Sequence, residues 1–152
     1  MRIFMSNKIA VITGASRGIG RAITLKYAQM GYDVAICCHH NKERLEETAK
    51  EVRSMQVRCL TYVGNIGNYN DACTFFHEIE AKLGSIDILI NNARLDPWRR
   101  TAEMTEGKWW SLVMDVNLKG AFLCSMAFFN RAKEYGWGRI VNIASVRSFR
   151  PA

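Results

Sequence analysis

The stretch Thr13-Gly14-Ala15-Ser16-Arg17-Gly18-Ile19-Gly20 decides the fold that we expect for this chain. It follows the apolar run Ile9–Ile12 and leads directly into the helical pattern Arg21–Ala28, so that a buried strand, a glycine-rich turn and a helix follow one another. Glycines in such a turn let backbone N–H groups approach a bound group closely, because no Cβ stands in the way. The N-terminus of the helix directs its unpaired N–H groups and the positive end of its dipole to the same place. The stretch therefore predicts a binding site for an anion such as a pyrophosphate.

The composition is that of an ordinary globular domain. The chain has 152 residues, of which 49% are hydrophobic and 23% charged, and this length is enough for a core. We therefore expect residues 1–152 to form a single domain. The net charge is +7, but the basic residues are scattered and no nucleic-acid-binding motif accompanies them, so we expect no nucleic-acid partner.

The sequence favours a cytoplasmic protein without a membrane segment. No uninterrupted apolar run approaches the roughly 18–20 residues that span a bilayer, and the apolar part of the first six residues is too short for a secretory signal. The five cysteines contain no C-x-x-C pair, which favours reduced thiols. His39 and His40 follow Cys37 and Cys38, but neighbouring residues on a strand point to opposite faces, so we predict no metal site.

Strand-like and helix-like segments alternate along the chain. After the first helix the apolar, strand-like runs are Val34–Cys37, Val57–Val63, Ile86–Ile90 and Arg139–Ala144, and the helical patterns cover 41–54, 70–83 and 105–135. This alternation predicts parallel strands joined by right-handed crossovers. The expected fold is α/β: a Rossmann-type, doubly wound sheet of about five strands in the order 3-2-1-4-5, between two helix layers. A ligand of such a sheet binds at the carboxyl ends of the strands.

Three further motifs accompany the glycine-rich turn: Asn91-Asn92-Ala93, Asn117 within Met114–Gly120, and the run Ile140–Ser145. With these motifs the sequence resembles the short-chain dehydrogenase/reductase family from Lys8 to its end, and within it the 3-oxoacyl-(acyl carrier protein) reductase-like members. The resemblance implies an oxidoreductase that binds NAD(H) or NADP(H) and transfers hydride between a carbonyl and an alcohol. The substrate it implies is a small-molecule or acyl-thioester carbonyl compound. It also implies a homo-oligomer.

Asn117 and Ser145 match two members of the family's catalytic Asn-Ser-Tyr-Lys set. Ser145 can donate a hydrogen bond to the substrate oxygen, where negative charge grows as hydride arrives, although a strand-end serine without this role is the alternative. Asn117 lies in an apolar helical pattern, where asparagine is unfavourable. The resemblance implies that Asn117 supports a water chain to the family's lysine.

The resemblance also implies which residues bind the cofactor: Gly14, Ser16, Arg17, Gly18, Ile19, Gly20, His39, Asn65, Ile66, Asn91, Ala93 and Arg94. Sites that prefer NAD place an Asp or Glu at the end of the second strand. Here that end reads Cys37-Cys38-His39-His40, and no acid occurs from there up to Glu43. Arg17, together with His39, can face a 2′-phosphate. NADP(H) is therefore favoured over NAD(H), the alternative being that Arg17 points into solvent.

The sequence departs from the family in three places. None of the five tyrosines has a lysine four positions later, so the Tyr-x-x-x-Lys motif is absent and the family's C-terminal part is expected to be missing. We therefore expect little or no turnover by this chain alone, the alternative function being a non-catalytic dinucleotide-binding or interaction module. Arg94 replaces a glycine and either obstructs the cofactor or contacts its phosphate. Asn65 replaces an aspartate that pairs with the adenine amino group, and its amide oxygen can accept the same bond.

Overall fold

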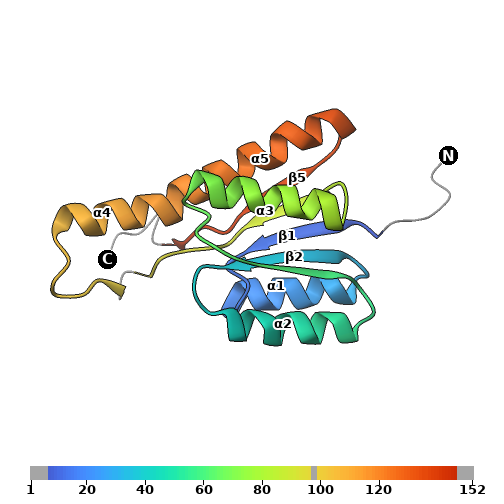
Figure 1. Ribbon diagram of the computed structural model, residues 1–152, viewed down its shortest axis with the longest axis horizontal. Helices are drawn as coiled ribbons and strands as arrows, with labels where there is room; N and C mark the ends of the chain where they lie inside the picture. The colour runs from blue at the N-terminus through green and yellow to red at the C-terminus, as the bar shows by residue number, and fades with distance from the viewer. Residues whose placement is uncertain (1–6, 97–98, 147–152) are drawn as a thin grey trace.

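The computed structural model describes residues 7–96 and 99–146 of the chain. Strands and helices alternate through it (Figure 1): β1 Ile9–Thr13, α1 Gly18–Gln29, β2 Asp33–Cys38, α2 Lys42–Ser54, β3 Cys59–Val63, α3 Tyr69–Lys82, β4 Ile88–Asn91, α4 Glu106–Met114, η2 Asp115–Lys119, α5 Gly120–Tyr135 and β5 Arg139–Asn142. Residues 1–6, whose apolar segment is too short for a secretory signal, lie outside the described part of the chain.

The strands form one parallel sheet in the order β3-β2-β1-β4-β5. This confirms the predicted fold class and strand order. β1 is the central strand, and its Val11 lies opposite Ala35 of β2 and Leu89 of β4. β1, β2 and β4 are buried along their whole length, as strands covered on both faces must be.

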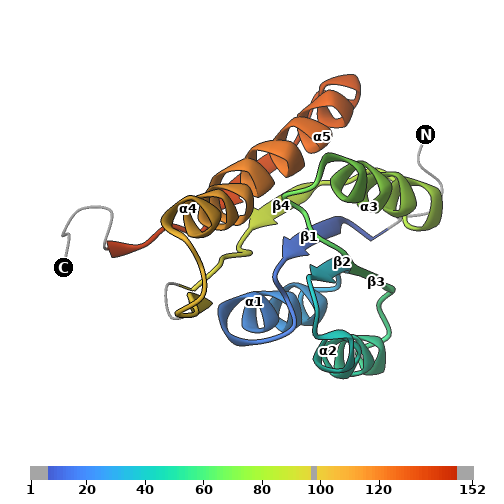
Figure 2. The same cartoon turned by 60° about the vertical axis from the view of Figure 1, so that its left-hand side comes forward.

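Helices cover both faces of the sheet. Figures 1 and 2 show α1 and α2 on one face and α3 with the α4–α5 helix on the other. Neighbouring residues of β1 serve the two faces in turn, because side chains alternate along a strand. Val11 packs in the core that includes Phe75 of α3 and Phe128 of α5, whereas Ile12 packs in the core that includes Leu45 of α2.

Two strands begin later than the sequence pattern predicts, and both do so at the amino edge of the sheet. β3 begins at Cys59 rather than Val57, and β4 begins at Ile88 rather than Ile86. Two carboxylates meet backbone donors at this edge: Asp33 Oδ1 accepts from the Arg58 N–H at 2.7 Å, and Asp87 Oδ2 accepts from the Ile9 N–H at 2.8 Å. At these positions a carboxylate accepts the hydrogen bond that a backbone carbonyl of the neighbouring strand would otherwise accept. The hydrophobic pattern of the sequence does not reveal such side-chain contacts.

The predicted helical stretch 105–135 is a continuous helix from Glu106 to Tyr135 with a π-helical turn, Asp115–Lys119, in its middle. Within the described part of the chain, this one helix is long and apolar enough to cross a membrane by length and composition. Its most apolar 18-residue window has a mean hydropathy of 1.4, and 17% of that window is buried. The sequence analysis considered uninterrupted apolar runs, whereas this helix mixes apolar residues with Ser, Gly and Asn, and the core helix of a soluble protein meets the same criterion.

Candidate functional site

The glycine-rich turn connects β1 to α1 at the carboxyl edge of the sheet. A Cβ on Gly14 would lie 2.7 Å from Cα of Ala93, and a Cβ on Gly20 would lie 2.4 Å from Nδ2 of Asn92. These two glycines therefore let the turn pack directly against the segment after β4. Gly18 differs, because it has a φ of +56° and nothing lies within 4 Å of its Cβ position. The turn is thus closed toward the protein and open at Gly18.

The first turn of α1 leaves its positive end available to an anion. The helix begins at Gly18, its N-cap residue Arg17 makes no side-chain capping bond, and no acidic residue lies in the first turn. The N–H groups at such a terminus lack helical partners, and no local charge neutralises the dipole. Arg17 and Ile19 are exposed, and Ser16 is partly buried. Such a terminus can bind an anion. We call the glycine-rich turn and the first turn of α1 the cradle, and its contact with a pyrophosphate stays a prediction.

Thr13 and Asn92 hold the turn against the segment after β4, and neither was among the predicted site residues. Thr13 Oγ1 accepts from the N–H groups of Asn92 and Ala93, both at 3.0 Å. Asn92 Nδ2 donates to the carbonyl oxygens of Thr13 at 2.8 Å and Gly14 at 3.1 Å. The only signal in the sequence is a threonine at the end of an apolar strand beside a glycine. The pair positions the cradle relative to β4.

Replacing Thr13 by Val is expected to destabilise the fold by about 2–3 kcal/mol, because two backbone N–H groups lose their acceptor at an unchanged volume. Urea denaturation followed by circular dichroism measures this loss. Thr13→Ser keeps the oxygen, removes only a methyl group and should cost about 1 kcal/mol or less. Equal losses in the two variants would show that packing, rather than the Oγ1 hydrogen bonds, gives Thr13 its importance.

Asn91 lies at the base of a pocket of about 410 Å³ at the carboxyl ends of β1, β4 and β5. Its side chain is buried, and Nδ2 donates to Ser125 Oγ at 2.9 Å and to Asn142 Oδ1 at 2.8 Å. Its Oδ1 has no hydrogen-bond partner among the described residues. The amide thus joins β4 to α5 and β5 beneath the pocket, and its predicted contact with the cofactor stays a prediction.

Asn117 occupies the π-helical turn and is exposed. Its Oδ1 accepts from the Leu95 N–H at 2.7 Å, and its Nδ2 donates to the Leu95 carbonyl oxygen at 3.4 Å. The asparagine thereby fastens the segment after β4 to the helix, where it also lines the pocket. Ser145 lies three residues beyond β5 and is exposed. Both residues belong to segments at the carboxyl edge of the sheet, and their catalytic roles stay predictions.

The two residues that depart from the family pattern are held by local interactions. Asn65 Oδ1 accepts from the Gly67 N–H at 3.0 Å, so one of its lone pairs is engaged within the loop after β3, next to buried Ile66. The Arg94 guanidinium forms an ion pair with Asp96 at 3.0 Å, and its side chain is 68% exposed. Arg94 does not adopt the positive φ that favours glycine, since Gln56 is the only described non-glycine residue that does.

His39 and His40 do not point to opposite faces as we expected. β2 ends at Cys38, so the two histidines lie in a bend beyond it, where their rings are in contact, with centroids 3.6 Å apart and a tilt of 33° between the ring planes. Burial and the neighbouring His40 lower the pKa of His39, whereas the Asp71 carboxylate opposes this shift. The structure shows no group of three potential metal ligands among residues 7–96 and 99–146.

The thiols near the sheet are buried side chains of the core. Burial raises the pKa of Cys37 far above its usual range, and burial raises the pKa of Cys124 to about 12. A thiol in this state carries almost no thiolate at neutral pH, and the thiolate is the reactive form. These two cysteines therefore contribute packing rather than chemistry to the site.

Comparison with known proteins gives a consistent result. The family of short chain dehydrogenases matches residues 8–152. A 3-oxoacyl-[acyl-carrier-protein] reductase of Staphylococcus epidermidis is 34% identical over 92% of this chain and 57% of its own length. A crystal structure of a putative short-chain alcohol dehydrogenase from Sinorhizobium meliloti superimposes with a TM-score of 0.86 at 30% identity, covering 97% of this chain and 58% of that one. The structure of an NAD⁺-bound xylitol dehydrogenase superimposes with a TM-score of 0.85 at 27% identity, covering 98% of this chain and 57% of that one. The chain thus spans under two thirds of the length of these relatives.

Proposed function

The chain belongs to the short-chain dehydrogenase family, and from this premise we propose that it binds a nicotinamide dinucleotide and serves hydride transfer between a carbonyl and an alcohol. The observation that carries the proposal is the cradle, which Gly14 and Gly20 close against the protein while Gly18 leaves it open. The substrate that we propose is a small-molecule or acyl-thioester carbonyl compound, as in the 3-oxoacyl reductase relative.

The residues of this chain have distinct roles in the proposed reaction. The N-terminus of α1 and the glycine turn bind the pyrophosphate, since free N–H groups and the helix dipole favour an anion there. Ser145 donates a hydrogen bond to the substrate oxygen, where charge develops in the transition state. Asn117 holds the segment after β4 in position through Leu95. The dinucleotide, when bound, supplies or accepts the hydride.

We propose NADP(H) as the preferred cofactor. The Arg17 side chain is exposed beside the cradle, and no carboxylate follows directly after β2, where a group that binds a free 2′-hydroxyl would lie. A guanidinium suits the 2′-phosphate because it is always charged and donates several hydrogen bonds. One similar structure is NAD⁺-bound, so membership of the family does not decide between NAD(H) and NADP(H). The support for NADP(H) comes from the residues of this chain.

Replacing Arg17 by Ala is expected to reduce the preference for NADPH over NADH about tenfold or more, because a charge-assisted hydrogen bond contributes roughly 1.5–3 kcal/mol. Titration of the intrinsic tryptophan fluorescence with each cofactor measures this ratio. Lys26→Ala, in the last turn of the same helix, is the matched control and should leave the ratio unchanged. Tighter binding of NADH than NADPH by the original chain would contradict the cofactor proposal.

We expect the purified 152-residue polypeptide to bind NADPH but to oxidise it slowly or not at all with a 3-oxoacyl thioester. The sequence contains no Tyr-x-x-x-Lys to protonate the product alkoxide, and positioned proton transfer contributes about 10²–10⁴-fold in rate. Absorbance at the NADPH band measures turnover. A clear substrate-dependent rate that Ser145→Ala abolishes would contradict this expectation.

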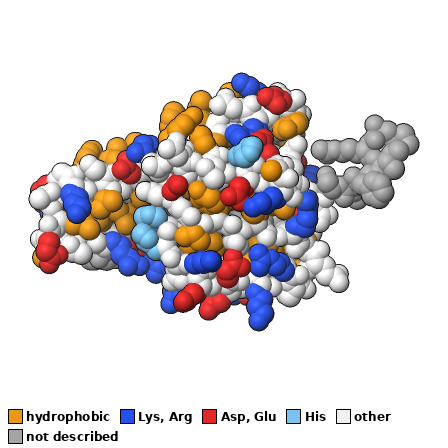
Figure 3. All heavy atoms as spheres, in the orientation of Figure 1, with side chains coloured by type: hydrophobic (Ala, Val, Ile, Leu, Met, Phe, Trp, Pro, Cys, Tyr) orange, Lys and Arg blue, Asp and Glu red, His pale blue; other side chains and the backbone are white. Residues whose placement is uncertain are grey.

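A second proposal is that the chain acts as a non-catalytic dinucleotide-binding or interaction module that self-associates. The exposed hydrophobic residues that support it lie on the α4–α5 helix: Trp110, Leu118, Phe122, Met126 and Phe129. Figure 3 shows hydrophobic side chains over this part of the surface. The helix also packs on the sheet through Cys124 and Phe128, which favours a cytoplasmic protein over a membrane-spanning one. Self-association of the purified chain, measured by analytical ultracentrifugation, would support this function, whereas NADPH binding without turnover is expected under both proposals.

A further inference from the structure

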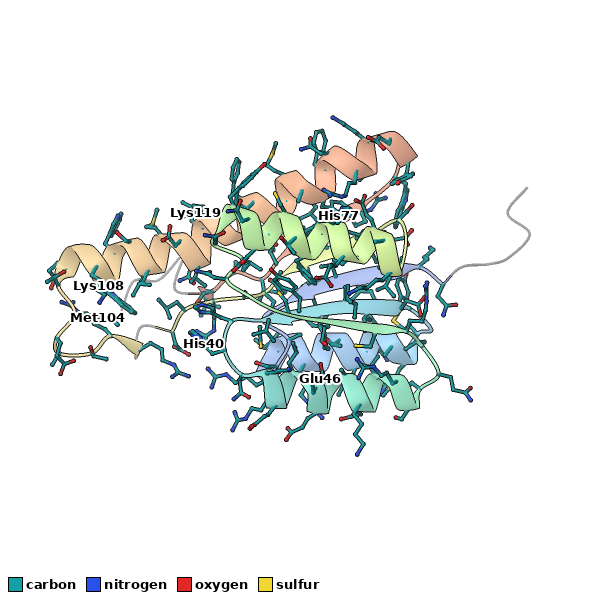
Figure 4. The ribbon with its side chains drawn as sticks, in the orientation of Figure 1. His40, Glu46, His77, Met104, Lys108 and Lys119 are labelled. Atoms are coloured by element: carbon teal, nitrogen blue, oxygen red, sulfur yellow. The ribbon has the colours of Figure 1, made fainter. Side chains whose placement is uncertain are left out.

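The two edge strands of the sheet, β3 and β5, differ in how side chains protect them. At the β3 edge the Arg53 guanidinium donates to the Cys59 carbonyl oxygen at 3.2 Å, and Thr61 Oγ1 donates to a carboxylate oxygen of Glu46 at 2.5 Å. Glu46 lies on α2 (Figure 4). Charged side chains at an edge strand hinder its pairing with another chain. At the β5 edge all four residues, Arg139–Asn142, are exposed, and no further strand pairs with them in the described part of the chain.

The backbone of β5 directs hydrogen-bonding groups out of the sheet in a regular pattern. The N–H groups of Arg139 and Ile143 donate to carbonyl oxygens on the β4 side of the strand, at 3.1 and 2.9 Å. Because alternate residues of a strand direct their N–H and C=O groups to opposite sides, those of Ile140 and Asn142 point away from β4. The edge therefore offers donors and acceptors to a second strand.

An apolar stripe on one side of the helix borders this edge. It consists of four exposed residues at helical spacing: Leu118, Phe122, Met126 and Phe129. Leu118 and Phe122 line the pocket of about 410 Å³ together with a residue of β5. Most of the large hydrophobic side chains that are exposed in the described part of the chain belong to residues 110–146. The β5 edge and the stripe thus form one continuous surface, which we call the open face.

A polypeptide strand fits the open face better than a lipid bilayer does. A bilayer would cover the apolar stripe, but it would leave the outward N–H and C=O groups of Ile140 and Asn142 without partners, which is costly in hydrocarbon. A second copy of the chain brings both an identical strand edge and an identical stripe. It therefore satisfies the hydrogen bonds and covers the apolar side chains at the same time.

We infer that two copies of the chain associate through antiparallel pairing of their β5 strands, with the two-fold axis at Val141, and so form one continuous sheet. The inference rests on the proposed self-association and identifies its surface. A two-fold axis perpendicular to the sheet keeps each face of the sheet on its own side. Both α5 helices then flank the junction on the same side, where their stripes can pack against one another.

Hydrogen bonding and charge select Val141 as the centre of the junction. This register pairs Ile140 with Asn142 of the second copy, so that their outward N–H and C=O groups bond to one another, and it places Val141 opposite its own counterpart. The two Arg139 side chains are then offset by four residues, or about 13 Å along the strands, which exceeds the Debye length of about 8 Å. A centre at Ile140 would halve this offset and increase their repulsion.

Substitutions at Val141 test the inference, because this residue faces itself across the axis. Val141→Lys and Val141→Glu should each weaken the dimer about tenfold or more in analytical ultracentrifugation, since like charges then lie directly opposite one another. An equimolar mixture of the two variants should restore the dimer, because opposite charges then meet. Val63→Lys is the matched control and should leave the dimer unchanged, since Val63 is also 43% exposed but lies on the other edge strand, β3. Circular dichroism checks that each variant is folded.

Val141→Cys provides a test in which the expected result is a gain. Opposite residues of a pair without mutual hydrogen bonds have Cα atoms about 4.5 Å apart, which lies within the range of disulfides. Mild oxidation should therefore produce a covalent dimer on non-reducing electrophoresis. Val63→Cys and the original chain should remain monomeric under the same conditions.

The possible outcomes distinguish the open face from self-association itself. A dimer that the Val141 substitutions do not weaken, or that Val63→Lys weakens equally, would overturn pairing through β5 and leave the proposed self-association standing. Failure of the mixture to restore the dimer, or of Val141→Cys to form a covalent dimer, would overturn the axis at Val141. A chain that stays monomeric would overturn both proposals, and its binding to vesicles of anionic phospholipid would identify a bilayer as the occupant of the open face.

Discussion

Replacing Gly18 by Asp is expected to weaken NADPH binding about 100-fold or more while the fold remains intact. The new carboxylate would lie in the open space of the cradle, where Gly18 has nothing within 4 Å of its Cβ position. Two unit charges about 4 Å apart near a protein surface repel by roughly 4 kcal/mol, and about 1.4 kcal/mol corresponds to a tenfold change in affinity. Asp tolerates a positive φ better than most residues, and a carboxylate stabilises a helix N-terminus. Fluorescence titration with NADPH measures the loss.

Gly31→Asp is the matched control for this variant. Gly31 follows the C-cap of the same helix, has a φ of +81° and also has nothing within 4 Å of its Cβ position. The substitution therefore introduces the same charge and a similar backbone strain at the opposite end of α1. NADPH binding should stay within about twofold of the original, since this end lies more than a Debye length of about 8–10 Å from the cradle. Equal losses of affinity in the two variants would contradict an anion site at the N-terminus of α1.

Replacing Asp33 by Asn is expected to destabilise the protein by about 3 kcal/mol. The buried carboxylate loses charge-assisted hydrogen bonds, which contribute roughly 1.5–3 kcal/mol each, whereas its partner Arg58, with a side chain that is 50% exposed, stays solvated. The Asp33 side chain is 2% exposed, and its two oxygens accept from the Arg58 N–H at 2.7 Å and from Arg58 Nε at 2.8 Å. The Arg58 guanidinium also donates to the carbonyl oxygens of Lys82 and Leu83 at 3.2 and 3.0 Å. The carboxylate thus ties the starts of β2 and β3 to the end of α3. The shift of the urea denaturation midpoint measures its contribution.

Glu78→Gln provides the comparison for Asp33→Asn. Glu78 pairs with Lys82 one helical turn away on an exposed surface, and such pairs contribute about 0.3–0.5 kcal/mol. The two substitutions make the same chemical change in different surroundings. Similar shifts of the denaturation midpoint in the two variants would show that the burial of Asp33 does not increase the contribution of its carboxylate to stability.

The sequence was most informative where one local rule decides the outcome. The alternation of strand-like and helical segments predicted the parallel sheet and its order, because crossovers between parallel strands have a fixed hand. The spacing of glycines predicted the cradle, because Gly14 and Gly20 admit neighbours that a Cβ would exclude. Apolar counting was less informative about the helix Glu106–Tyr135, since an exposed apolar helix face and a membrane helix have similar mean hydropathy.

The sequence could not predict contacts that link distant segments. Thr13 reaches Asn92 and Ala93 across about 80 residues of chain, and no periodic pattern marks a hydroxyl that accepts two backbone N–H groups. The orientation of His39 and His40 was predicted wrongly because it depended on the residue at which β2 ends. Strand boundaries depend on tertiary hydrogen bonds, here those of Asp33 and Asp87.

The sequence by itself determined the family and the α/β fold and predicted a candidate anion site, because these depend on short-range steric and periodic rules that residue types express directly. The tertiary structure alone decided how the site is held, with Asn91 joining α5 and β5 and Asn117 fastening the segment at Leu95. It also decided that the two histidine rings are in contact beyond β2. These features require residues from distant segments, or side chains in a bend, to meet in one geometry. The energies of these interactions depend on the distances between side chains and on their burial, and both are defined only in the folded chain.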